Sequence, residues 1–171
     1  MFTVLRTQPI EYVSLYDEAV DDSAMTLEAI KEYARTRDIS KLPLRPGRTP
    51  ITWVLFPLDS YTLRYALSAS PHASDGSLFT DMLAYHLVQV GLKEAKNLPD
   101  GAPLFNLRKM GMLELVADDF VKAIPPEVVR EVGSVIYDIS TVSDDAKKKS
   151  PSHSDEPKLK SGSIATPAPK G

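Results

Sequence analysis

The sequence predicts a single small α+β domain with a short sheet, three to five helices and a disordered C-terminal tail. Residues 51–56, ITWVLF, are β-branched and aromatic, which is typical of a strand. Several longer segments repeat apolar residues at helical spacing. Residues 143–171 are rich in Ser, Pro and Lys and poor in large apolar side chains, which is typical of disorder. We therefore expect a globular domain over residues 1–142 and a flexible tail over 143–171.

The composition limits the functions that the chain can have. It has 171 residues, 43% of them hydrophobic, which suits one modest core. The net charge of -3 does not suggest the strongly basic domain that nucleic-acid binding favours. The chain has no cysteine, which excludes disulfides, thiolate zinc sites and thiol nucleophiles. No signal-peptide pattern and no membrane-spanning apolar run is present, so we expect a soluble, unexported protein without a membrane partner.

The first third of the chain predicts one strand and one helix. Residues 2–5, FTVL, suit a short strand. A helix is expected over 24–35, with Asp22 or Ser23 as its N-cap. Residues 36–50 are rich in proline and locally basic, so they predict an irregular connection.

The strongest predicted strand, residues 51–56, is apolar on both faces, so we expect it to be buried on both. Its residue Trp53 is therefore assigned to the core. Residues 59–68 alternate like a strand, but Asp59 suits a helix N-cap, and we favour a helix there.

The second half predicts two helices around a turn. A helix is expected over 78–90, with Gly91 as its C-terminal cap. Residues 99–101, Pro-Asp-Gly, predict a turn between two short strands. Residues 113–124 place apolar side chains roughly in helical phase, so we expect another helix there.

The most regular segment is a final helix that begins at Pro126, where a missing N–H costs nothing. Gly133 interrupts it at a cost of about 1 kcal/mol against alanine, and we expect it to let another backbone approach closely. One apolar stripe runs along this helix, consisting of Val128, Val132, Val135, Ile136 and Ile139.

No arrangement of residues specifies a reaction, so we expect no enzyme, no metal and no cofactor. The chain has three histidines, without metal-ligand spacing. His86, on a predicted amphipathic helix, is interpreted as a boundary residue. The neighbouring carboxylates Asp118 and Asp119 are interpreted as capping or solvating a helix, because adjacent side chains point in different directions.

Six residues are candidates for contact with a partner. Four belong to the last helix, where core packing and a partner-binding face both remain open. Two belong to the basic loop, which suits either a solvated connection or an acidic partner. These candidates are Val128, Val132, Val135, Ile139, Arg45 and Arg48.

Three segments together resemble small morphogenesis proteins of tailed bacteriophages and prophages. They are GRTPITWVLFPLDSYTLRYA, VQVGLKEAKNLPDGAPLF and AIPPEVVREVGSVIYDISTVSDDAKKKS, within residues 48–150 or close to them. The aromatic residue usual in the middle segment is absent, with Leu92 and Lys93 in that region.

The resemblance implies a non-enzymatic tail assembly chaperone that binds phage structural proteins in the host cytoplasm during assembly. A flexible tail suits binding followed by release. One alternative is a structural virion protein of the capsid or the head–tail junction. Another is a small nucleic-acid-binding regulator that uses the basic loop and the tail lysines, although a nucleic-acid partner is not expected. Self-association remains open.

Overall fold

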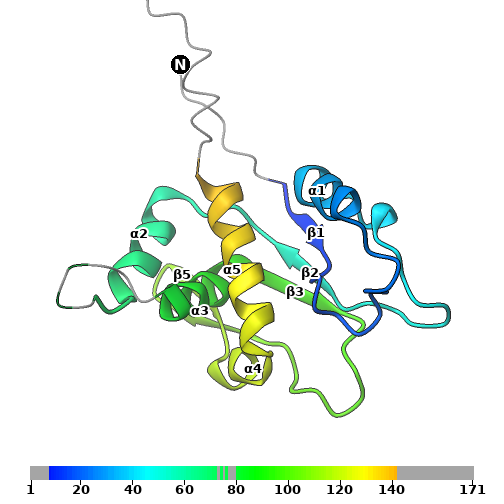
Figure 1. Ribbon diagram of the computed structural model, residues 1–171. Coiled ribbons are helices and arrows are strands. Elements are labelled where there is room, and N and C mark those ends of the chain that lie inside the picture. The colour runs from blue at the N-terminus through cyan, green and yellow to red at the C-terminus, as the bar shows by residue number, and fades with distance from the viewer. Residues whose placement is uncertain (1–7, 73, 75, 77–79, 142–171) are drawn as a thin grey trace, which may run out of the picture.

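The structure is a computed structural model that describes residues 8–72, 74, 76 and 80–141. Over these residues five α-helices combine with two small antiparallel sheets, which confirms the predicted α+β class (Figure 1). The strand predicted at 2–5 and the tail predicted at 143–171 lie outside the described residues. None of the described helices is both long and apolar enough to cross a bilayer.

The larger sheet has three antiparallel strands in the order β1-β2-β3. They are β1 (Ile10–Tyr12), β2 (Thr52–Leu55) and β3 (Leu92–Lys96). All four residues of β2 are buried, which confirms the strand predicted at 51–56 and its burial on both faces. The register pairs Tyr12 with Trp53 on one side of β2 and Leu92 with Leu55 on the other.

Helix α1 (Leu27–Thr36) begins three residues later than the sequence predicted. Its N-cap is Thr26, whose hydroxyl accepts from the Ala29 N–H at 3.1 Å. The predicted caps Asp22 and Ser23 belong to a preceding turn, in which the N–H and hydroxyl of Ser23 donate to Asp21 and the Met25 N–H donates to the Asp22 carbonyl. The short 3-10 helix η1 (Ile39–Lys41) lies inside the predicted irregular connection.

Helix α2 (Ser60–Ala69) confirms the helical interpretation of the ambiguous segment 59–68. The carboxylate of Asp59 accepts from the Thr62 N–H at 2.7 Å, so the predicted N-cap is also confirmed.

Helix α3 (Thr80–Gly91) runs directly into β3, and the start predicted at residue 78 lies outside the described residues. Gly91 ends the helix but does not adopt the left-handed conformation of a glycine cap, so that prediction is wrong. Packing explains the glycine instead, because an added Cβ would lie 2.6 Å from Cγ2 of Ile136.

The helix predicted at 113–124 is wrong over its first half. The first residues of this segment form β5 (Leu113–Val116), which makes a hairpin with β4 (Leu107–Met110). Only α4 (Asp118–Ala123) is helical. The two-residue turn at Gly111 and Met112 provides β5 with a neighbouring strand, and this pairing overrides the helical spacing. The predicted turn at 99–101 does lie between two strands, β3 and β4, although they belong to different sheets.

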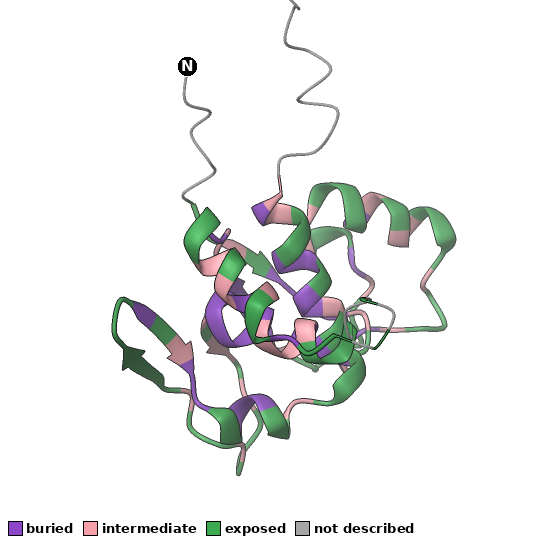
Figure 2. Cartoon of the chain, turned by 90° about the vertical axis from the view of Figure 1, so that its left-hand side faces the viewer, coloured by how far each residue is buried: buried purple, intermediate pink, exposed green. Residues whose placement is uncertain are grey.

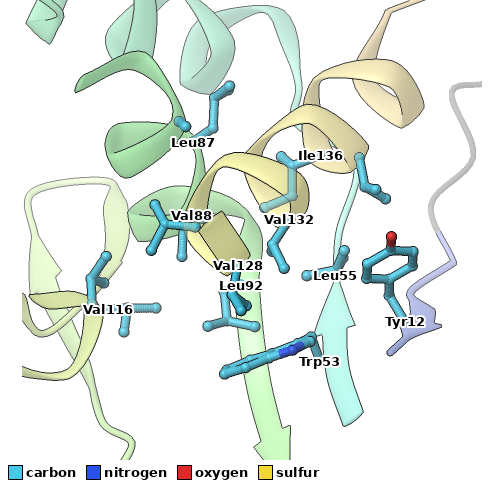
Figure 3. Close-up of a cluster of buried hydrophobic side chains, with 14 of the residues drawn as sticks. Tyr12, Trp53, Leu55, Leu87, Val88, Leu92, Val116, Val128, Val132 and Ile136 are labelled. Carbon is cyan, nitrogen blue, oxygen red and sulfur yellow. The ribbon is translucent and has the colours of Figure 1, made fainter. Parts of the chain in front are cut away.

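Helix α5 (Pro126–Ser140) begins where the sequence predicted and packs along α3, the most extensive contact between two elements. Figure 3 shows Val128 and Val132 of α5 pointing toward Trp53, Leu55 and Leu92 of the three-stranded sheet. This layer of side chains between the α3–α5 pair and the sheet is the core of the protein.

Candidate functional site

The apolar stripe of α5 belongs mainly to the core. Val128, Val132 and Val135 are buried, and Ile139 is half-buried. The valines contribute to the cluster that α3 and the three-stranded sheet complete, so packing accounts for them (Figure 3). Of the two interpretations of the stripe, core packing is the one that burial supports.

The two candidate arginines are exposed and lie close to carboxylates of the segment between β1 and α1. Arg45 is 3.9 Å from Asp22, and Arg48 is 4.0 Å from Glu18, measured between side-chain nitrogen and oxygen. Exposed pairs of this kind contribute about 0–1 kcal/mol each, so the arginines stay free to exchange partners. The neighbouring acids also prevent the loop from forming a purely positive patch.

A groove of about 430 Å³ brings two of the six predicted residues together, Arg48 and Val128. The other four predicted residues are not among the described residues that line it. We call it the Trp53 groove. Its lining comes from the segment between β1 and α1, the basic loop, β2, the connection after β3, and α4 with the start of α5.

The floor of the Trp53 groove is apolar and aromatic. Trp53 and Phe120 are almost fully buried beneath it, and Phe120 stacks edge-to-face on Phe105 with the ring centroids 5.2 Å apart. The predicted core position of Trp53 is confirmed, since it is 4% exposed. Its indole N–H has no hydrogen-bond partner among the described residues, which leaves one buried polar atom at the base of the site.

The rim of the groove is polar. Tyr16, which is 63% exposed, lines the opening together with the polar side chains of Asn97 and Arg48. Asp17 also lines the groove, but its carboxylate already accepts hydrogen bonds from the backbone N–H groups of Ala19 and Ile51, at 2.8 and 2.9 Å. An apolar floor with a few polar rim groups suits a segment of another protein.

Next to the groove, a carboxylate joins α5 to the start of the chain. Glu131 accepts from the Tyr12 hydroxyl at 2.7 Å, from the Ser14 hydroxyl, and from the Leu15 N–H at 3.1 Å. Burial first, and then the charge of Glu131, raise the pKa of Tyr12, so this phenol stays protonated and donates. The cluster therefore fixes β1 against α5.

A second polar cluster fixes α4 against α3. Asp118 accepts from the Tyr85 hydroxyl at 2.7 Å and from the Gln89 side-chain amide at 2.6 Å. The hydrogen bond from Tyr85 is the main cause that lowers the pKa of Asp118. His86 contacts the Gln89 side chain at 3.1 Å and is half-buried, as its interpretation as a boundary residue predicted.

Asp118 and Asp119 lie in the first turn of α4, where negative charge stabilises the helix. This position agrees with their predicted structural role. Within the ranges that the structure describes, no group of three or more His, Asp or Glu side chains is placed to hold a metal ion.

Sequence reasoning missed Tyr16 and Phe120 as parts of a site. Tyr16 is an aromatic residue in the polar stretch SLYDEA, and this contrast was the one available signal. Phe120 was hidden in a segment interpreted as a helix with one apolar face. Comparison with protein-family models, with curated proteins and with solved structures finds no match for this chain.

Proposed function

We propose that this protein is a non-enzymatic protein-binding module of bacteriophage assembly, similar in role to a tail assembly chaperone. The observation that carries the binding role is the Trp53 groove, because it combines a buried aromatic floor with the exposed rim residue Tyr16. The phage context rests on the resemblance of three sequence segments to small morphogenesis proteins of tailed bacteriophages. These segments lie within residues 48–150 or close to them.

The proposed ligand is an apolar segment of an unassembled phage structural protein. Its apolar side chains would cover Phe120 and the neighbouring apolar lining, while polar groups at its edges would meet Arg48 and Tyr16. Buried aromatic residues and arginines contribute more to protein interfaces than other residues do. At about 430 Å³, the groove lies within the size range of binding sites in proteins, about 300–1,000 Å³.

The experiment is affinity purification of the tagged full chain from an induced lysate of its host strain, with mass spectrometry of the lysate complexes and of purified particles. We expect unassembled tail proteins in the complexes and no copy of this protein in the particles. Near-stoichiometric presence in particles would instead support the structural virion alternative. Retention on DNA at low salt without any phage protein would support the regulator.

The groove itself is tested by Ala123→Trp, because Ala123 is exposed on α4 and lines the groove. The added indole should fill the groove and remove the captured protein. Ala34→Trp, at an exposed position of α1 that is not part of the groove lining, is the matched control. Equal capture by both variants would contradict the role of the groove.

A further inference from the structure

Strand β4 is the most exposed strand of the described chain. All four of its residues, Leu107–Met110, are exposed, and it pairs only with β5 among the described elements. Figure 2 shows the hairpin projecting from the body of the protein, with β4 coloured as exposed along its length. One edge of β4 is therefore open for a further strand.

The hairpin geometry determines which backbone groups this open edge presents. Gly111, with φ of 62°, is the first of the two turn residues, as a type II′ turn requires. Met110 and Leu113 then form the hydrogen-bonded pair beside the turn, and hydrogen-bonded pairs alternate along the ladder. The bond from the Ala117 N–H to the Asn106 carbonyl, at 3.2 Å, fits this alternation. The backbone N–H and C=O groups of Leu107 and Lys109 therefore point away from β5.

Apolar side chains surround this open edge. Met112 at the turn is 93% exposed, Leu104 before the strand is 86% exposed, and Met110 is about half exposed. Exposed apolar side chains gathered on one projecting element mark a surface that a partner covers. Methionine side chains adapt to many partner shapes, which suits contact with apolar side chains of different size on the added strand.

The charges of β4 argue against a second copy of this chain in the two registers that are centred on Arg108 and on Lys109, and a pair centred on Leu107 would join only that residue of β4. A two-fold antiparallel pair that joins the outward groups of Leu107 and Lys109 sets Arg108 directly opposite Arg108 of the other copy. The next register toward the turn sets Lys109 opposite Lys109 instead. Like charges directly opposite each other destabilise a strand pair.

The same charges define the strand that does fit. Opposite Leu107-Arg108-Lys109-Met110, a complementary strand carries two acidic residues flanked by apolar residues. Asp119 already lies 4.0 Å from Arg108, but both side chains are mostly exposed, so this contact leaves Arg108 able to meet a second carboxylate. Glu114 is opposite Lys109 on the β5 side, which leaves the outer side of Lys109 for the partner.

We propose that the open edge of β4 binds an extended segment of another protein, with the pattern apolar-acidic-acidic-apolar, as a third strand of the hairpin sheet. Backbone hydrogen bonds to Leu107 and Lys109 would provide the binding, and the charges of Arg108 and Lys109 would select the sequence. This surface is separate from the Trp53 groove, so it does not depend on the function proposed for the groove.

The probe is the synthetic peptide acetyl-Thr-Val-Glu-Glu-Val-Thr-amide, and its control replaces both Glu by Lys. Both are titrated into the isotope-labelled full chain, and backbone amide signals are followed by NMR. We expect shifts centred on β4, slower hydrogen exchange at the Leu107 and Lys109 amides, and about tenfold tighter binding of the acidic peptide. The double variant Arg108→Glu/Lys109→Glu should prefer the Lys peptide.

Lys109→Pro is a second variant, because it removes an outward N–H without removing a hydrogen bond of the hairpin itself, and it should lose both peptides. Ala123→Trp should bind the acidic peptide like the unmodified chain. Equal binding of both peptides, shifts away from β4, or no binding at millimolar concentration would each overturn the proposal. Such a failure would leave the capture result for the groove unchanged, so the two proposals can fail separately.

Discussion

Gly133 of α5 packs directly on the backbone of Ala84 in α3. A Cβ added at Gly133 would lie 2.8 Å from both Cα and Cβ of Ala84 and 3.0 Å from its carbonyl oxygen. Side-chain rotation cannot relieve this contact, because two of the three atoms belong to the backbone. The glycine that weakens α5 as an isolated helix is therefore what lets the two helices approach so closely.

Gly133→Ala should destabilise the protein although alanine is the better helix former. The gain in helix propensity is about 1 kcal/mol, whereas forcing two packed backbones apart costs about 1–3 kcal/mol or more. We expect a net loss of up to about 2 kcal/mol in the free energy of unfolding, measured by urea denaturation. Ser134→Ala, at the next and exposed position of α5, is the control and should not lose stability. A more stable Gly133→Ala variant would mean that the helices can separate without cost.

Glu131→Gln should weaken the attachment of β1 to α5. The carboxylate accepts three hydrogen bonds, from Tyr12, Ser14 and Leu15, whereas an amide offers one acceptor oxygen and presents an N–H₂ group to the remaining donors. Leaving such donors without an acceptor costs about 1–3 kcal/mol. The same change at Glu127, an exposed residue in the first turn of α5, is the control for loss of one charge on this helix. Equal denaturation curves for the two variants would contradict the structural role of the cluster.

Asp59→Asn should change how stability depends on pH. The hydrogen bond from the Thr62 N–H lowers the pKa of Asp59 below its ordinary value of 3.8. A carboxyl whose pKa is lower in the folded state stabilises the fold above its unfolded pKa, and this stabilisation is lost as the pH falls through the folded pKa.

Asparagine caps a helix nearly as well as aspartate but does not titrate, so the variant should be close to the unmodified chain at pH 7. Its free energy of unfolding should fall less between about pH 5 and pH 2. Denaturation at several pH values checks this, with Asp100→Asn, the same change at an exposed turn residue, as control. A pH dependence as steep as that of the unmodified chain would contradict the prediction.

The two candidate arginines should behave differently in partner binding. Arg48 lines the Trp53 groove, whereas Arg45 is not among its lining residues, although both are exposed and lie near carboxylates. Arg48→Glu should reduce capture of the partner about tenfold, and Arg45→Glu should leave it nearly unchanged. Quantitative mass spectrometry of the captured proteins measures both. An equal loss for the two variants would indicate general attraction by a basic loop.

The rim tyrosine provides a similarly matched pair. Tyr16 and Tyr61 are both 63% exposed, but Tyr16 lines the groove and Tyr61 lies on α2. Tyr16→Ala should reduce capture, since an aromatic anchor at an interface contributes about 2 kcal/mol, while Tyr61→Ala should not. Thermal denaturation should show similar stability for both, because neither ring is buried. Loss of capture with Tyr61→Ala alone would place the contact on α2 instead.

The elements with local signals could be predicted from the amino-acid sequence alone. The β-branched run at 51–56, the Asp59 cap and the start of α5 at Pro126 follow from chemistry within a few residues, and the structure contains all three. The spacing of the α5 stripe also predicted one continuous apolar face that includes Val132, and its burial in the structure assigns that face to the core.

The features that depend on residues far apart in the chain became visible only in the folded protein. Residues 113–116 form a strand because β4 lies beside them. Residue 91 is a glycine because the Ile136 side chain occupies the space that a Cβ would need. The Trp53 groove joins Tyr16, Arg48 and Phe120, whose positions in the sequence carry no sign of their proximity. Helix and strand signals act over one or two turns of chain, whereas a binding surface forms only when packing brings separate segments together.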